Sequence, residues 1–135
     1  SDTFNGDWLF TITRRRRLPI KPLLMDNRLL VGIGNIYASE SLFHAGISPL
    51  RLAEQINRQD CQALAEAIRD TLHASIAAGG SSVRDYVHSD GGAGCYQLSC
   101  AVYDRQGQPC LACGTAISLV RQAGRSTYYC SECQI

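Results

Sequence analysis

The chain has 135 residues, of which 45% are hydrophobic and 19% charged, and its formal net charge is +1. This composition supplies a packed core and excludes an intrinsically disordered chain, and the length fits one domain or two small ones. No run of about 18 apolar residues and no segment typical of a signal peptide occurs, so we expect neither a membrane span nor secretion.

The first distinctive segment is a run of four basic residues, Arg14–Arg17. Such a run is typical of a nucleic-acid contact or of an ordinary solvated segment. We interpret it as a solvated segment that precedes the first helix, and we expect Trp8 to pack against the helical part of the molecule.

Two short helices with a tight turn between them are predicted next. The first begins at Lys21-Pro22, since proline is favoured at the first helical position, and ends before Gly32-Ile33-Gly34. The second covers about 36–45, with Asn35 at its N-cap and Gly46 just past its end.

The glycine–asparagine turn is a candidate anion site. The start of a helix presents free N–H groups and a partial positive charge, and Lys21 adds a full charge nearby. A plain helix cap beside a surface lysine explains the same residues equally well. This is not a dinucleotide fingerprint, because the third glycine is missing.

The clearest periodicity predicts a long helix over about 58–78, where apolar residues recur at spacings of three and four. Asn57 is placed to cap its start and Gly79-Gly80 to stop it. A further short helix is predicted near 82–87.

A turn-rich stretch at 88–94 marks the best domain boundary. It divides the chain into a helical domain, 1–90, and a second part, 91–135, whose pattern is typical of short strands and turns. Three strands are predicted in that part, Gln97–Tyr103, Ala116–Gln122 and Ser126–Tyr129.

Four of the seven cysteines form two Cys-x-x-Cys pairs separated by 16 residues, Cys110 with Cys113 and Cys130 with Cys133. This spacing is typical of four thiolates that hold one tetrahedral zinc ion, with no position left for a catalytic water. Two disulfides or a redox dithiol are the alternatives, but a redox motif needs one pair and usually a βαβ unit. We therefore expect one structural zinc ion and a reducing cytoplasm.

The other three cysteines are interpreted as buried small hydrophobic residues. Between the two pairs, Arg125 falls at the tip of the predicted hairpin. An arginine there reaches a phosphate or a minor groove, unless it is an ordinary solvated side chain.

Two stretches of this sequence resemble bacterial formamidopyrimidine-DNA glycosylase. Residues 20–27 and 31–43 look like the helix-two-turn-helix element of that family, and residues 109–134 resemble its zinc finger. The resemblance implies a mainly α fold with a small β part, a helix-two-turn-helix DNA-binding domain followed by a loop end, a strand and a four-cysteine zinc-finger β-hairpin. The related endonuclease VIII branch is less similar.

The family excises oxidised purines such as 8-oxoguanine and formamidopyrimidines from DNA and then cleaves the abasic strand by β,δ-elimination. The resemblance places Lys21, Asn35 and Arg125 on phosphates around the flipped nucleotide and makes Tyr103 a further backbone contact. Arg125 is also given a supporting catalytic role. Residues 81–96 match a mobile loop that closes over the everted base, with Gly92 where some relatives have lysine.

The family's nucleophile is an N-terminal proline followed by glutamate in a β-sandwich domain. This sequence begins Ser1-Asp2-Thr3-Phe4, which matches the family's interdomain segment. We therefore expect the C-terminal half of such an enzyme, with no catalytic residue of its own and no activity alone.

The expected partners are duplex DNA with oxidised purines and the missing β-sandwich domain. We expect a monomer in the bacterial cytoplasm, at the nucleoid. A zinc-containing adaptor that binds DNA or protein without catalysis is the alternative, and a zinc-stabilised fold with no DNA role is a third possibility.

Overall fold

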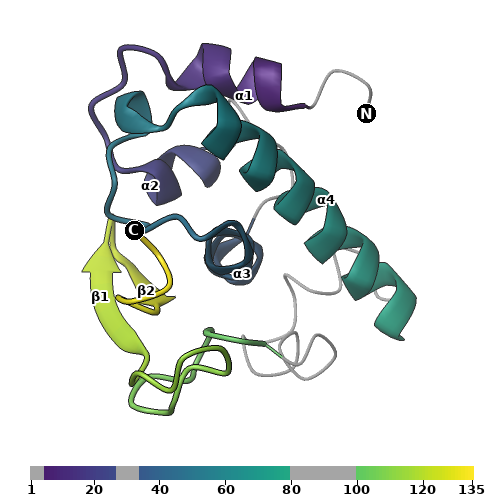
Figure 1. Cartoon of the computed structure of the whole chain (residues 1–135), viewed down its shortest axis with the longest axis vertical. Helices are drawn as coiled ribbons and strands as arrows, with labels where there is room; N and C mark the ends of the chain where they lie inside the picture. Colours follow the sequence, from purple (N-terminus) through teal and green to yellow (C-terminus); the bar gives the residue numbers. More distant parts are fainter. Residues whose placement is uncertain (1–4, 27–33, 80–99) are drawn as a thin grey trace.

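The computed structural model describes residues 5–26, 34–79 and 100–135. In these ranges it is mainly helical with one small antiparallel sheet, as predicted (Figure 1). The elements are α1 (Gly6–Thr13), α2 (Ile20–Leu24), α3 (Asn35–Ala45), a 3-10 turn (Ala53–Gln55), α4 (Arg58–Gly79), β1 (Ser118–Gln122) and β2 (Arg125–Tyr129).

The long helix α4 organises the helical part. It begins where predicted, because the backbone N–H of Asp60 donates to the Asn57 side chain at 2.7 Å. Its apolar stripe packs on α1 and α3 and includes Leu64 and Ile68, both almost fully buried. At Gly6 the backbone of α1 lies so close to α4 that a Cβ atom would come within 2.8 Å of the Gln62 Cα atom.

Helix α1 was not predicted from the sequence. Asn5 caps it, since its side chain accepts the backbone N–H of Trp8 at 2.9 Å. The arginine run therefore follows the first helix rather than preceding it. Trp8 packs against the main core, as expected.

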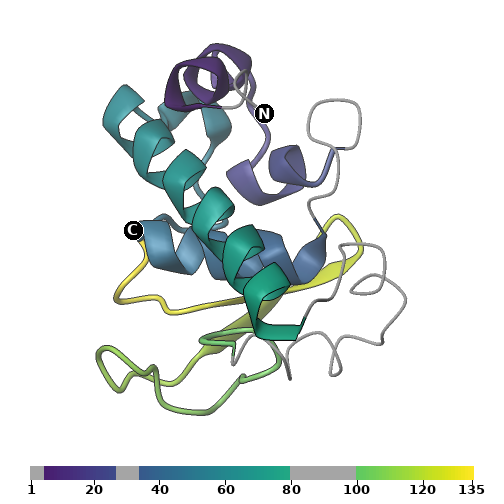
Figure 2. The ribbon, with the colours of Figure 1, turned by 90° about the vertical axis from the view of Figure 1, so that its right-hand side faces the viewer.

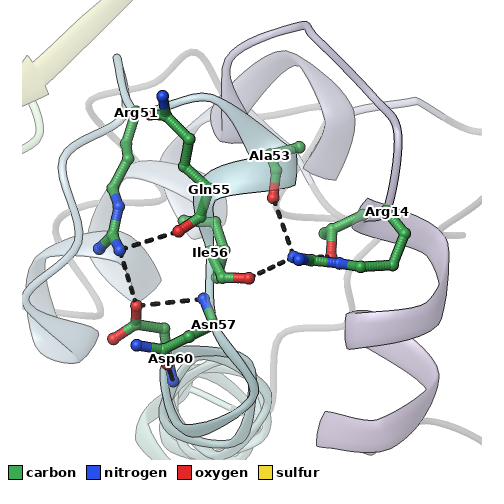
Figure 3. Close-up of polar contacts among 8 residues, drawn as sticks. Arg14, Arg51, Ala53, Gln55, Ile56, Asn57 and Asp60 are labelled. Carbon is green, nitrogen blue, oxygen red and sulfur yellow. Dashed lines mark hydrogen bonds and ion pairs between the residues drawn. The ribbon is translucent and has the colours of Figure 1, made fainter.

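The first arginine of that run has a structural role. The Arg14 guanidinium stacks over the Phe10 ring at 4.1 Å. It also donates to the backbone carbonyl groups of Ala53 and Ile56 (Figure 3). It thereby joins the end of α1 to the segment that leads into α4. The interpretation of the run as a wholly solvated segment is wrong for Arg14 and agrees with the exposure of the three arginines that follow.

Helices α2 and α3 differ from the prediction at their starts. Helix α2 begins at Ile20, one residue early, and ends at Leu24. Helix α3 begins at Asn35 itself, with Gly34 as an N-cap that has no side-chain bond, so the prediction of Asn35 as the cap is wrong. Its other end is as predicted, with Gly46 at a φ of 75°.

The C-terminal sheet is a two-stranded hairpin in which Ser118 pairs with Tyr129 and Gln122 with Arg125. The hairpin contributes to a second, smaller core, which includes Val102, Ile117 and Tyr128. Helix α3 lies between this hairpin and α4, so both parts of the molecule rest on it (Figures 1 and 2).

The predicted strand 97–103 is wrong in its described part, since residue 100 has no regular structure and residues 101–103 form bends and a turn. Three successive backbone N–H groups of this segment converge on the buried carboxylate of Glu40, which excludes the alternating pattern of a strand. Ala101 donates at 2.7 Å, Val102 at 2.9 Å and Tyr103 at 2.9 Å. The helix near 82–87, the boundary at 88–94, the 81–96 loop and Gly32-Ile33 lie outside the described residues.

Candidate metal centre and nucleic-acid interface

The two Cys-x-x-Cys turns bring their four sulfur atoms into one cluster. All four Sγ atoms lie within 4.8 Å of one another, with 3.8 Å between Cys110 and Cys133 and 3.4 Å between Cys113 and Cys130. A tetrahedral zinc ion with Zn–S bonds of about 2.3 Å requires sulfur separations of about 3.8 Å. The cluster therefore fits one zinc ion with all its ligands supplied by the chain.

The local backbone explains why these turns form. Gly114 follows the first pair at a φ of 82°, a conformation that favours glycine. The Cys110 N–H donates to the Thr115 carbonyl at 2.8 Å, which folds the chain back over the first pair. In the second turn, the Cys133 N–H points at the Cys130 sulfur at 3.4 Å.

The thiols of the cluster differ in acidity. Hydrogen bonds from the Thr115 hydroxyl and N–H lower the pKa of Cys113 to about 6, whereas the neighbouring Cys113 and Cys130 sulfur atoms raise the pKa of Cys133 to about 12. Four thiolates at this distance repel one another, so their joint ionisation needs a cation among them. A bound zinc ion supplies that charge.

Gln134 fastens the second cysteine turn to the helical part. Its buried side chain accepts the Cys130 N–H at 2.8 Å and donates to the Ile47 carbonyl just after α3 at 3.0 Å. The main chain of Ile135 adds bonds to Gly46 and Ser48. The metal centre is thus held rigidly against the C-terminal end of α3.

The opposite end of α3 contacts the tip of the same hairpin. The Asn35 amide donates to the Ser126 carbonyl at 3.0 Å. The oxygen of the same side chain accepts a hydrogen bond from the ammonium group of Lys21 at 2.5 Å. Asn35 therefore links α2, α3 and β2, and this role replaces the predicted helix cap.

Lys21 is a buried cation without a carboxylate partner among the described residues. It is 1% exposed, and its Nζ atom donates to Asn35 Oδ1 and, at 2.9 Å, to Thr127 Oγ1, both neutral acceptors. Burial, and then the positive charge of Arg125, lower the pKa of Lys21 to about 8.

Arg125 and Lys21 both line a depression of about 170 Å³. Four other residues complete its lining, Pro22, Met25, Gln122 and Ala123. Arg125 is exposed, and within the described ranges no carboxylate pairs with it. Two cations from α2 and β2 therefore face one hollow, and no carboxylate from the described part of the chain neutralises them, which is the arrangement that attracts a phosphate group.

Tyr103 does not line this depression. Its ring packs edge-to-face on Tyr128 with 5.0 Å between the ring centres, and it contacts both cores. The structure thus brings Lys21, Asn35 and Arg125 together and sets Tyr103 apart from them, at the base of the hairpin.

Sequence reasoning missed two residues that shape the site, Thr127 and Glu40. In the sequence, Thr127 is an ordinary β-branched strand residue and Glu40 an ordinary helix-surface acid. Their partners are 106 and 61–63 residues away in the chain, so no local signal marks them.

The remaining described cysteines differ. Cys61 is fully buried, as predicted, whereas Cys100 is partly exposed and disulfide-bonded, so the prediction is wrong for Cys100. None of the helices in the described ranges combines the length and apolar character that a membrane span requires.

A helical unit and a four-cysteine hairpin that share one cationic hollow define the class, a zinc-finger protein of the helix-two-turn-helix type. Residues 1–87 match the family model of the formamidopyrimidine-DNA glycosylase H2TH domain, and residues 107–135 match that of the zinc finger found in FPG and IleRS. The chain belongs to the formamidopyrimidine-DNA glycosylase family.

Curated relatives agree with this assignment. The chain is 63% identical over 134 residues to the formamidopyrimidine-DNA glycosylase of Dechloromonas aromatica and 52% identical over 134 residues to that of Thiobacillus denitrificans. These alignments cover 99% of this chain but 48% and 50% of the relatives. The chain therefore spans about half the length of the curated relatives it matches.

Solved structures of the family have the same fold. The MutM (Fpg) protein of Thermus thermophilus superimposes with a TM-score of 0.84 at 40% identity, over 99% of this chain and 51% of that one. Lactococcus lactis Fpg, bound non-covalently to DNA that contains an AP site, gives 0.83 at 32% identity, over 98% and 47%.

Proposed function

We propose that this chain is the DNA-binding C-terminal region of a base-excision-repair glycosylase and AP lyase that removes oxidised purines, 8-oxoguanine and formamidopyrimidine. The observation that carries the proposal is that Lys21 and Arg125 line one hollow without a carboxylate among the described residues, while Asn35 holds Lys21 by a hydrogen bond and is itself bonded to Ser126 of β2. Their N–H groups are suited to phosphates of the strand that carries the lesion.

The chain supplies binding rather than base excision. Catalysis in the family is assigned to an N-terminal proline and glutamate in a β-sandwich domain, and none of the described residues takes those roles. We therefore assign that domain as the partner, damaged duplex DNA as the ligand, and the bacterial cytoplasm, at the nucleoid, as the location. Tyr103 contributes a further backbone contact from the base of the hairpin.

The test measures binding to a duplex that contains one 8-oxoguanine, by fluorescence anisotropy at several salt concentrations. Arg125→Ala is expected to weaken binding and to reduce the slope of log affinity against log salt by about one. Arg17→Ala is the matched control, because Arg17 is an exposed arginine (its side chain is 89% exposed) and does not line the hollow. Both variants are expected to fold normally.

Two outcomes contradict the proposal. Equal affinities of Arg125→Ala and the wild type would favour an adaptor that docks a protein. Borohydride trapping of the purified chain on an 8-oxoguanine duplex would contradict the absence of catalysis.

A further inference from the structure

The hydroxyl group of Thr127 makes a hydrogen bond that the formation of strand β2 does not require. Thr127 lies on β2, fully buried, opposite Val120 in the hairpin register. A valine would satisfy the same backbone preference and fill nearly the same space. What threonine adds is Oγ1, which accepts the Lys21 ammonium at 2.9 Å.

The Lys21 ammonium has three N–H donors, and two of them are fixed from different sides. Asn35 on α3 accepts one and Thr127 on β2 accepts the other. These two bonds set the orientation of Nζ, and no third acceptor for it lies among the described residues. We infer that the third N–H serves a ligand in the hollow that Lys21 shares with Arg125. Within the described residues Arg125 is the charged group that acts on Lys21, and it does so by repulsion.

We propose that Thr127 is a positioning residue, which holds the Lys21 ammonium charged and aimed at a backbone phosphate. This inference rests on the proposed function, since it presumes that Lys21 binds DNA. It also relates the zinc centre to phosphate binding, because Thr127 belongs to the hairpin that lies between the two cysteine pairs.

The chain offers an unusually direct measurement, since Lys21 is its sole lysine. Isotope-labelled lysine therefore gives one side-chain NMR signal, whose pH titration reports the protonation of Lys21 in the zinc-loaded full chain. The variants are Thr127→Val, which removes the acceptor at constant shape, and Thr127→Ser, which keeps it. Loss of a hydrogen bond to a charged group is expected to move the midpoint of Thr127→Val down by about one pH unit.

Thr127→Ser is expected to titrate like the wild type. A Thr127→Val midpoint equal to that of the wild type would overturn the inference. So would a Thr127→Ser midpoint shifted as far as that of Thr127→Val, because packing of the methyl group would then be the cause.

Affinity for a duplex that contains a tetrahydrofuran abasic analogue gives the second readout. Thr127→Val is expected to bind about tenfold more weakly than the wild type, and Thr127→Ser within about twofold of it. Equal affinity of Thr127→Val and the wild type would overturn the positioning role and leave the proposed function intact. Absence of salt-dependent binding by the wild type would instead contradict the proposed function, while the lysine titration still decides whether Thr127 sets the protonation of Lys21.

Discussion

The carboxylate of Glu40 accepts the backbone N–H of Val102 at 2.9 Å, so a residue in the middle of α3 fixes a segment 62 residues further along the chain. The same carboxylate holds the N–H groups on either side of Val102. Glu40 is 3% exposed, and its charge is offset by these three donors. This contact sets the base of the zinc hairpin against the helical part.

Glu40→Gln is therefore expected to lower the free energy of unfolding. An amide of the same shape places an NH₂ group against backbone donors and removes the charge that strengthens the remaining bonds. We expect a loss of about 3 kcal/mol in urea denaturation. Glu66→Gln, an exposed residue on α4, is the control and is expected to change stability by less than about 0.5 kcal/mol. Equal stabilities of the two variants would contradict the role of the Glu40 carboxylate.

Lys21 makes the stability of the protein depend on pH. Its pKa is about 8 in the folded chain against 10.5 for an ordinary lysine, so folding opposes its charged form. The free-energy penalty for burying the charged Lys21 is fully present below pH 8. It falls as the pH rises toward 10.5, because in that range the unfolded chain binds more protons than the folded chain.

Comparison with Lys21→Met isolates this effect. Between about pH 7.5 and pH 9.5 the free energy of unfolding of the wild type is expected to rise by about 2 kcal/mol relative to the variant. Parallel pH profiles in urea denaturation would show that the fold does not oppose the charge on Lys21.

Zinc removal is expected to abolish DNA binding while most of the helical content remains. The main core is built within the helical part, whereas the hairpin has only the small core around Val102. Cys113→Ser is expected to lose the metal, the hairpin and the affinity together. Cys61→Ala, which alters a buried cysteine outside the cluster, is expected to keep one zinc ion per chain. Metal content and circular dichroism check both variants.

Gln134→Leu separates metal binding from docking of the metal centre. The variant keeps all four cysteines but loses the bonds to Cys130 and Ile47. We expect one zinc ion per chain, a loss of about 2 kcal/mol in stability and weaker DNA binding. Wild-type affinity in the variant would show that the hairpin needs no support from this side chain.

Local patterns were sufficient for α4 and the cysteine centre. The apolar spacing and the Asn57 cap act within a few residues, and the Cys-x-x-Cys turns follow from short backbone geometry. Helix α1 carried a comparable signal, an asparagine three residues before Trp8, which sequence reasoning did not use.

The failures share one cause, which is competition from distant partners. Asn35 has the side chain of a helix cap, but Lys21 and Ser126 bind it instead. The predicted strand 97–103 has suitable side chains, but the Glu40 carboxylate captures the backbone of its described end. Likewise, a basic run predicted the exposure of Arg17 but not the partly buried Arg14 guanidinium, which donates to the Ala53 carbonyl group.

The bond between Lys21 and Thr127 spans 106 positions of the chain. The cationic hollow consequently exists only after both halves of the molecule have closed on each other, and neither half carries it alone. DNA that binds only the closed, folded protein stabilises it against unfolding. At saturation, the melting temperature of the protein should therefore rise with the logarithm of the DNA concentration.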